Sequence, residues 1–317
     1  MVTLRVIPYC GASFTKNTEI LACKIARYMF STPKDQKIIL DLDYEGWDIV
    51  NNGLEQCVKN ICDELCIDYS MIEFTSNDRL CKSRIFKHTI NKKNIRWWSI
   101  LCKRQTKNID IKLPTKFDYS LFCGRATNER LYSFWKHKNW QYSNRGKASM
   151  HLDLSTVSEQ NNDFDGFICE HNSKWRSLIP MLPYSDTGET IDPTNLKYEE
   201  VVVAPDIWDK VYNDIAIEVV CETNTTADTF FVTEKTFRPI AYGRLFLVIG
   251  SPKFEQNLKT LGFDIFDDII DKTYDIESSY LRIDAVFKSL EKLLQNPVDM
   301  QSILQRLEAN KTVLENL

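Results

Sequence analysis

The sequence is poor in glycine, proline and histidine, and it has no long hydrophobic run. Its 317 residues include 10 glycines, 10 prolines and 4 histidines, while 43% are hydrophobic and 26% are charged. This composition excludes collagen-like, low-complexity and disordered chains. No apolar run approaches the roughly 20 residues of a membrane span, and the first residues lack the pattern of a secretory signal. We therefore expect a globular, cytoplasmic protein without a membrane span.

The ten cysteines lack the spacing of a zinc site, because no two of them form a Cys-x-x-Cys pair. Cys57, Cys62 and Cys66 follow an amphipathic helical pattern and have no histidine partners. The histidines likewise show no spacing that is typical of metal or triad chemistry. We expect no metal site here, and reduced thiols that pack as small apolar groups.

Strand and helix patterns alternate along the chain in two series. The first series has strands at 3–8, 37–42 and 71–75 and helices at 17–31 and 51–66. The second has strands at 117–123, 215–221 and 245–249 and helices at 128–138, 234–243, 252–261, 279–295 and 298–315. Such alternation predicts α/β domains with parallel sheets covered on both faces. We expect one domain over 1–115 and another over 116–317, at the usual size of about 100–200 residues.

Positive charge is concentrated in the segment 79–107, although the whole chain has a net charge of −4. The segment contains ten basic residues and no acidic one: Arg79, Lys82, Arg84, Lys87, Lys92, Lys93, Arg96, Lys103, Arg104 and Lys107. Because like charges repel, such a run favours a polyanionic partner such as nucleic acid. A solvated basic face is the alternative.

The most informative stretch is 217–266, in which a strand ending at Cys221-Glu222 precedes a polar loop and a capped helix start. Thr233 is a good N-cap, and Lys235 follows it. Free N–H groups and the positive end of the helix dipole would favour an anionic group such as a diphosphate. Glu234 has the chemistry to accept hydrogen bonds from a ribose diol. A solvated Glu-Lys pair at an ordinary helix start is the alternative.

The segment Val232-Thr233-Glu234-Lys235-Thr236-Phe237-Arg238-Pro239-Ile240, followed by an apolar strand and Gly250-Ser251-Pro252, resembles the donor-binding domain of GT-B glycosyltransferases. It is most similar to the α-1,3-fucosyltransferase family. The segments Leu261-Gly262-Phe263 and Tyr274-Asp275 are also similar to glycosyltransferase-like proteins of phages and giant viruses. The segment 120–130, SLFCGRATNER, resembles the opening of the same domain. The resemblance covers about 117–295, and its most specific part is 232–252.

The resemblance implies a GT-B-like fold, with two Rossmann-like domains facing a cleft. It implies that Arg125 or Arg130 and Lys235 hold the phosphates of a nucleotide sugar, with Thr233 and Glu234 at the donor site. It places Glu222 near the sugar or ribose. The sequence departs from the family at Thr223-Asn224, where fucosyltransferases more often have Asn directly after the Glu. Neither a cofactor nor a metal is then required, and if the protein is viral, its compartment would be the host cytoplasm.

The turn after the second strand offers two further interpretations. Asp41 and Asp43 form an Asp-x-Asp pattern, which GT-A enzymes use to hold Mn²⁺ or Mg²⁺. A strand end or a turn cap is the alternative role for Asp41. The pattern is short and recurs at Asp163 and Asp165. In an inverting, metal-independent transferase, the same turn would supply a carboxylate that takes the proton of the acceptor hydroxyl. Glu45 is the first candidate and Asp43 the next.

We therefore expect a glycosyltransferase that uses a nucleotide-diphosphate sugar. Its expected acceptor is a hydroxymethylated base in phage-type DNA, bound by the basic residues Lys82, Arg84, Lys87, Lys92, Lys93, Arg96, Lys103 and Arg104. A glycan-directed, fucosyltransferase-like enzyme and a non-catalytic nucleic-acid-binding protein are the alternatives. The sugar, the nucleotide and the oligomeric state stay open.

Overall fold

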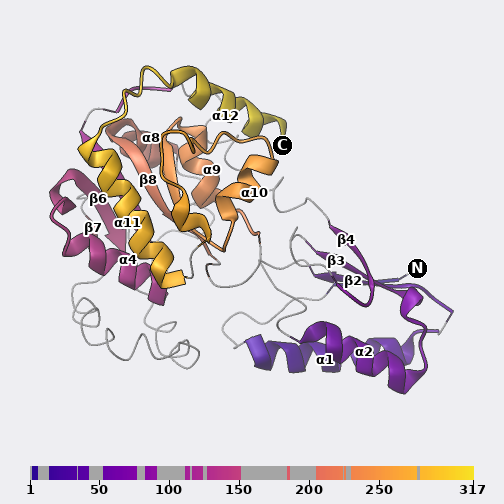
Figure 1. Ribbon diagram of the computed structural model, residues 1–317. Coiled ribbons are helices and arrows are strands. Elements are labelled where there is room, and N and C mark those ends of the chain that lie inside the picture. Colours follow the sequence, from indigo (N-terminus) through magenta and orange to yellow (C-terminus); the bar gives the residue numbers. More distant parts are fainter. Residues whose placement is uncertain are drawn as a thin grey trace. The chain divides into compact units, whose positions relative to one another are not determined.

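The computed structural model describes residues 2–5, 14–33, 35–42, 53–76, 83–90, 111–114, 116–123, 127–150, 184–185, 205–223, 225, 230–276 and 279–317. The chain divides into two compact units (Figure 1). Unit 1 comprises Met1–Ile95 and Ala227–Phe231, and unit 2 comprises Arg96–Thr226 and Val232–Leu317. This division falls between residues 95 and 96, inside the basic segment 79–107 and before the predicted boundary at residue 115.

Unit 1 contains a four-stranded parallel sheet with two α-helices. Its elements are β1 (Val2–Arg5), α1 (Phe14–Ser31), β2 (Ile38–Leu42), α2 (Leu54–Leu65), the 3-10 helix η1 (Tyr69–Met71), β3 (Ile72–Ser76) and β4 (Lys87–Ile90). The strands lie in the sequential order β1-β2-β3-β4. Because successive right-handed crossovers step in the same direction, they put their helices on one face. Figure 1 shows α1 and α2 side by side on one side of the sheet.

The two faces of this sheet differ in polarity. Leu40 and Phe74 are fully buried against α1 and α2, together with Leu21, Ile25, Val58 and Cys62 of the helices. The neighbouring strand positions point to the other face and carry Asp41, Glu73 and Thr75. The prediction of a sheet covered by helices on both faces is therefore wrong for the part of unit 1 that the structure describes. Its alternating pattern is that of a sheet with one apolar face.

Unit 2 has a five-stranded sheet in the order β7-β6-β5-β8-β9, in which only β7 is antiparallel. Its strands are β5 (Phe117–Cys123), β6 (Gly146–Met150), β7 (Tyr184–Ser185), β8 (Ile215–Cys221) and β9 (Leu245–Ile249). Its helices are α4 (Asn128–Lys138), α8 (Pro205–Asp214), α9 (Glu234–Ala241), α10 (Phe254–Thr260), α11 (Ser279–Gln295), α12 (Leu304–Asn316) and the 3-10 helices η2 (Ser143–Arg145) and η5 (Thr273–Ile276).

The order of this second sheet reverses between β5 and β8. The chain passes from β5 through α4 to β6 in one direction, and from β8 through α9 to β9 in the other. Right-handed crossovers therefore put α4 and α9 on opposite faces. α11 contacts α4 and β9, whereas α12 contacts α9, so both faces of unit 2 are covered by helices (Figure 1). The predicted α/β class is confirmed, while the predicted cleft between two domains stays a prediction.

Candidate functional site

The reversal between β5 and β8 marks the edge of unit 2 where a ligand is expected. In open α/β sheets, ligands bind outside the carboxyl ends of the strands at such a switch point. The paired register of β5 and β8 ends at Leu121 and Val219, although both strands continue for two residues. The residues that follow are those that the sequence predicted as a donor site. In unit 1, the described strands are in sequential order and provide no such point.

Arg130 links the first turn of α4 to the end of β8 at this edge. Its α-helix, α4, begins with Thr127 as N-cap, whose hydroxyl accepts the backbone N–H of Arg130 at 3.4 Å. The Arg130 side chain is buried, and Nη2 donates to the carbonyl oxygens of Cys221 (3.4 Å) and Glu222 (3.2 Å). We therefore interpret Arg130 as a positioning residue. Arg125, the other residue predicted to hold phosphate, lies outside the described residues.

Glu222 links the end of β8 to the start of α9. One carboxylate oxygen accepts the backbone N–H of Thr233 (3.2 Å) and the hydroxyl of Thr236 (2.5 Å). The other oxygen accepts the hydroxyl of Thr233 (2.7 Å) and the N–H of Thr223 (3.1 Å). A carboxylate offers about four lone-pair sites, so these donors use them all. The sequence expectation placed Glu222 beside the sugar or ribose, whereas the buried side chain is engaged in holding α9.

The backbone N–H groups in the first turn of α9 are also hydrogen-bonded within the protein. The N–H groups of Thr236 and Phe237 donate to the carbonyl oxygen of Thr233, and that of Lys235 donates to the Thr233 hydroxyl at 3.3 Å. Thr233 is thus the N-cap that the sequence predicted. The expectation of free N–H groups for a diphosphate is wrong at these positions, because each of them has an internal acceptor. The charge of Lys235 and the helix dipole remain available to attract an anion.

Lys235 lies at the open side of this turn, with its side chain about one-fifth exposed. Its ammonium group is 3.2 Å from Glu234 Oε1, 3.1 Å from the Thr223 hydroxyl and 3.2 Å from the Thr233 hydroxyl. A phosphate oxygen is a stronger acceptor for an ammonium group than a neutral hydroxyl. An incoming phosphate can therefore replace one of the two threonine hydroxyls as a partner of Lys235.

Among the described side chains of this turn, Glu234 has the one buried polar atom without a hydrogen-bond partner. The residue is 6% exposed, and its Oε2 atom is buried without a hydrogen-bond donor. Burial raises the pKa of Glu234, but the charges of Lys235 and Arg238 outweigh it and hold the pKa below the usual range. Glu234 is therefore an anion whose second oxygen needs a donor, and a buried acceptor without one costs about 1–3 kcal/mol. A ligand hydroxyl beside Lys235 would supply that donor once the side chains that cover Oε2 shift to admit it.

A polar and aromatic cluster that the sequence analysis missed lies behind α9. Arg238 stacks on the ring of Trp208 at 3.8 Å, and Tyr212 donates a hydrogen bond to Glu218. Burial raises the pKa of Glu218 to about 7. Glu218 lies on β8 and Glu222 directly follows the strand, four residues further on, so the alternation of the strand places both on the same face. That spacing is a signal that could have identified the cluster.

The candidate catalytic residues Glu45 and Asp43 lie outside the described residues, so their roles stay predictions. Asp41 is the next-to-last residue of β2, and its carboxylate accepts the hydroxyl of Thr75 at 2.7 Å. The Asp-x-Asp interpretation also needs Asp43 and is therefore not tested. Within the part of the chain that the structure describes, no group of three or more metal-binding side chains is brought together.

Most of the basic segment also lies outside the described residues, including Lys82, Lys92, Lys93, Arg96, Lys103 and Arg104. Arg84 is exposed, while its backbone N–H donates to the buried carboxylate of Glu55 at 2.5 Å. Lys87, on β4, is 3.2 Å from Glu73. Part of the segment is thus docked on α2 and paired into the first sheet, which the sequence analysis did not predict.

His88 and Ser76 form a pair in unit 1 that superficially resembles a nucleophile and its base, with 2.8 Å between Nε2 and Oγ. The N–H of Ser83 donates to His88 Nδ1 at 2.9 Å, so the ring proton of a neutral His88 is on Nε2. His88 then donates to Ser76 and does not act as its base.

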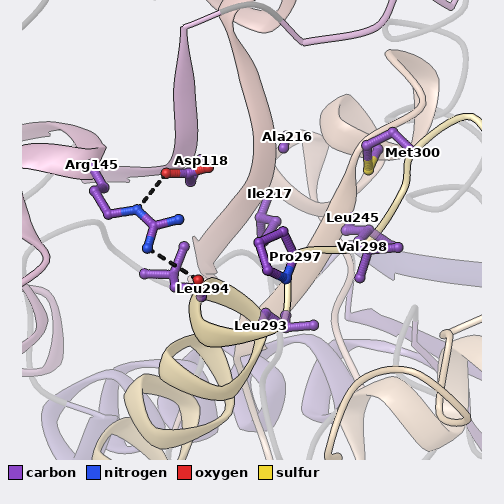
Figure 2. A pocket seen from close by; sticks show the side chains of 10 residues that line it. All are labelled: Asp118, Arg145, Ala216, Ile217, Leu245, Leu293, Leu294, Pro297, Val298 and Met300. Carbon is purple, nitrogen blue, oxygen red and sulfur yellow. Dashed lines mark hydrogen bonds and ion pairs between the residues drawn. The ribbon is translucent and has the colours of Figure 1, made fainter.

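A small hollow of unit 2 lies at the opposite edge of the second sheet (Figure 2). It is lined by the first residues of β5, β8 and β9 and by the connection between α11 and α12. Figure 2 shows Arg145 bridging Asp118 (2.7 Å) and the carbonyl oxygen of Leu294 (3.1 Å). Because it lies at the amino ends of the parallel strands, it is not where an α/β sheet usually binds its ligand.

No helix among the described residues is long and apolar enough to cross a membrane.

Comparisons with known proteins add no further assignment. Searches against protein-family models, curated proteins and solved structures found no match to this chain.

Proposed function

We propose that unit 2 binds a nucleotide-diphosphate sugar at the carboxyl edge of β5 and β8, and that the protein is a glycosyltransferase. The observation that carries this proposal is the first turn of α9, where the unpartnered Oε2 atom of Glu234 lies in the same turn as the ammonium group of Lys235. A nucleoside diphosphate offers both complementary groups, a diol that donates hydrogen bonds and an anionic phosphate. The resemblance of 232–240 to the fucosyltransferase donor domain supports the same assignment.

The proposed reaction uses these groups at the leaving diphosphate. The acceptor hydroxyl attacks the anomeric carbon, its oxygen forms the new glycosidic bond, and the bond to the diphosphate oxygen breaks. Lys235 and the positive end of α9 stabilise the charge that develops on the diphosphate. Arg125 is proposed as a second phosphate contact on sequence grounds alone. A carboxylate, Glu45 or Asp43, takes the proton of the hydroxyl.

A thermal-stability screen tests the donor site directly. A bound ligand at 100 times its Kd stabilises a protein by about 2.7 kcal/mol, which corresponds to roughly 5–10 °C for a unit of this size. We expect one of UDP, GDP and CDP, or its sugar conjugate, to produce such a rise. In Glu234→Gln and Lys235→Ala the rise should shrink, while Lys259→Ala, a surface lysine paired with Asp267, should respond as the wild type does. If none of these nucleotides stabilises the wild type, the donor site is misplaced.

Turnover tests the catalytic base separately from donor binding. Glu45→Gln should lower transfer or sugar-nucleotide hydrolysis by about 10²–10⁴-fold without changing the thermal shift caused by the donor. Equal turnover in the variant would transfer the role to Asp43. Measurable hydrolysis of a sugar nucleotide would also exclude the alternative of a non-catalytic nucleic-acid-binding protein.

A further inference from the structure

Two buried cysteines face each other at the switch point of unit 2. Cys123 is the last residue of β5 and Cys221 the last residue of β8, and each is 1% exposed. The register of Leu121 and Val219, extended by two residues, puts the two side chains next to each other on the same face of the sheet, and a hydrogen bond between the thiols shifts the pKa of both. Both are free thiols. The two sulfur atoms therefore lie together at the base of the candidate site, one residue before Glu222.

The backbone at this level is compatible with a bond between the two sulfurs. Neighbouring strands lie about 4.8 Å apart, which is within the roughly 4.4–6.8 Å that separates the Cα atoms of a disulfide. Extending the register by two residues from Leu121 and Val219 reaches these cysteines, but the ladder between β5 and β8 has already ended there. On their outer sides both cysteines stay paired, Cys123 with Met150 of β6 and Cys221 with Ile249 of β9, so a movement of Cys221 towards Cys123 acts on the pairing of β8 with β9.

We propose that Cys123 and Cys221 form a reversible disulfide that switches the first turn of α9 between a binding-competent reduced state and a displaced oxidised state. Hydrogen peroxide is the proposed oxidant, because it is close to water in size and the thiols are buried. The effect on ligand binding rests on the proposed function, whereas formation of the disulfide does not.

The chemistry proceeds in two steps. The Cys221 thiolate attacks one oxygen of the peroxide, the O–O bond breaks, and a sulfenic acid forms while the released hydroxide takes a proton and leaves as water. The sulfur of Cys123 then attacks the sulfur of Cys221, the S–O bond breaks, and the second hydroxide leaves as water with the proton of the Cys123 thiol. Two thiols and one peroxide thus give one disulfide and two waters. A dithiol reductant reverses the change.

The environment favours Cys221 as the attacking sulfur. The hydrogen bond from Cys123 and the positive charge of Arg130 lower the pKa of Cys221, while the same hydrogen bond and burial raise that of Cys123. The thiolate is the reactive form. One thiol is thereby prepared for attack on the oxidant, and the other stays protonated for the second step.

Closure of the disulfide acts on the site through Glu222 and Arg130. Movement of Cys221 displaces the adjacent Glu222, whose carboxylate accepts the N–H and hydroxyl of Thr233. It also displaces the carbonyl oxygens that Arg130 holds. Because Thr233 caps the turn that carries Glu234 and Lys235, a shift of Glu222 loosens the ligand-binding side chains.

The test uses the full chain in reduced and peroxide-treated forms, with free thiols alkylated and the linkage identified by peptide mass spectrometry. Hydrogen exchange at the amides of Thr233 and Lys235 reports the state of the turn, and binding of UDP and GDP reports the site. We expect a 123–221 linkage, faster exchange at both amides and nucleotide binding weakened about tenfold, all reversed by dithiothreitol. Cys123→Ser should lack these changes, whereas Cys62→Ser, which alters a buried cysteine of α2, should retain them.

Oxidation of the exposed Cys23 and Cys66 while Cys123 and Cys221 stay reduced would overturn the proposal. A 123–221 linkage that leaves the exchange of both amides unchanged would overturn the switch. If the exchange responds but the reduced protein binds neither nucleotide, the switch stands and the donor-site assignment fails. The wild-type measurements decide these outcomes even if Cys123→Ser does not fold.

Discussion

The Glu222 carboxylate shows how one buried side chain can define a binding turn without touching the ligand. Its four donors come from Thr223, Thr233 and Thr236, so it connects the loop after β8 with both the cap and the first turn of α9. The resemblance to the fucosyltransferase donor domain placed Glu222 near the sugar or ribose. It did not identify the role, because Thr233 and Thr236 lie 11 and 14 residues away.

Glu222→Gln keeps the volume of the side chain but turns one acceptor group into a donor. The new amide NH₂ would face hydroxyl or N–H donors in a buried site, so we expect the free energy of unfolding to fall by about 2–4 kcal/mol. Denaturant titration measures this loss. Glu308→Gln, at an exposed position of α12, should change the free energy by less than about 0.5 kcal/mol. Similar stability of both variants would show that the donors around Glu222 do not depend on its charge.

Glu73 makes unit 1 sensitive to acid. The hydrogen bond from Lys37, together with the bond from Thr89, lowers the pKa of Glu73 from 4.5 to about 2. A carboxylate with a depressed folded-state pKa stabilises the fold above its unfolded pKa, and that contribution is lost as the pH falls from about 4.5 towards 2. We expect Glu73→Gln to remove this part of the acid dependence.

Hydrogen exchange of the β3 amides between pH 4.5 and 2 measures this effect within unit 1. After correction for the intrinsic pH dependence of exchange, protection in the wild type should fall across this window. Glu73→Gln should start with lower protection and show a flatter profile. Glu64→Gln, at an exposed position of α2, serves as the control. An unchanged profile in Glu73→Gln would show that Lys37 and Thr89 do not stabilise the ionised form.

Strands and helices with continuous apolar or capped patterns were the predictable part of the fold. The predicted bounds of β5, β8 and β9 are confirmed, since each strand is apolar at most of its positions and ends before Gly124, Glu222 or Gly250. Helix α4 begins after the Thr127 cap, as predicted. The strands β4 and β6 were missed. Both are short and polar in sequence (Lys-His-Thr-Ile and Gly-Lys-Ala-Ser-Met), and only pairing with β3 and β5 makes them strands.

Arg282 of α11 joins two of the predicted elements at the site edge. The buried guanidinium donates to the carbonyl oxygens of Thr225, after β8, and Gly250, after β9. We expect Arg282→Met to leave two buried carbonyl oxygens without these donors and to lower the free energy of unfolding by about 2–5 kcal/mol. Nucleotide binding should weaken with it, because the loop after β8 carries Thr223 beside Lys235.

Denaturant titration and a nucleotide-binding titration check this prediction together. Arg306→Met is a suitable control, because Arg306 pairs with Asp264 and Asp268 at a more exposed position of the same unit. It should weaken stability less and leave nucleotide affinity unchanged. Wild-type stability of Arg282→Met would contradict the inference that Arg282 holds the loops after β8 and β9 together.

The distribution of charge over the whole chain bears on the acceptor. Residues 1–114 contain 18 Lys and Arg against 13 Asp and Glu, a net charge of +5, whereas the rest of the chain carries −9. In unit 1, the ion pair of Lys87 with Glu73 neutralises one residue of the basic segment, and the exposed Arg84 adds to its charge. The remaining positive charge of the segment lies mainly in residues 92–107.

If the acceptor is a base in duplex DNA, binding should weaken steeply with salt. The logarithm of the association constant falls by about 0.9 per logarithmic unit of salt for each phosphate contacted. We expect the combined Lys92→Ala, Lys93→Ala and Arg96→Ala variant to reduce that slope by about 2–3 and to weaken binding to all sequences alike. A matched variant with Lys259, Lys288 and Lys292 of unit 2 replaced by alanine should keep the wild-type slope. Fluorescence anisotropy with a labelled duplex, from low to physiological salt, measures both slopes. A slope that the first variant leaves unchanged, or no binding at low salt, would remove DNA as the acceptor and favour a glycan hydroxyl.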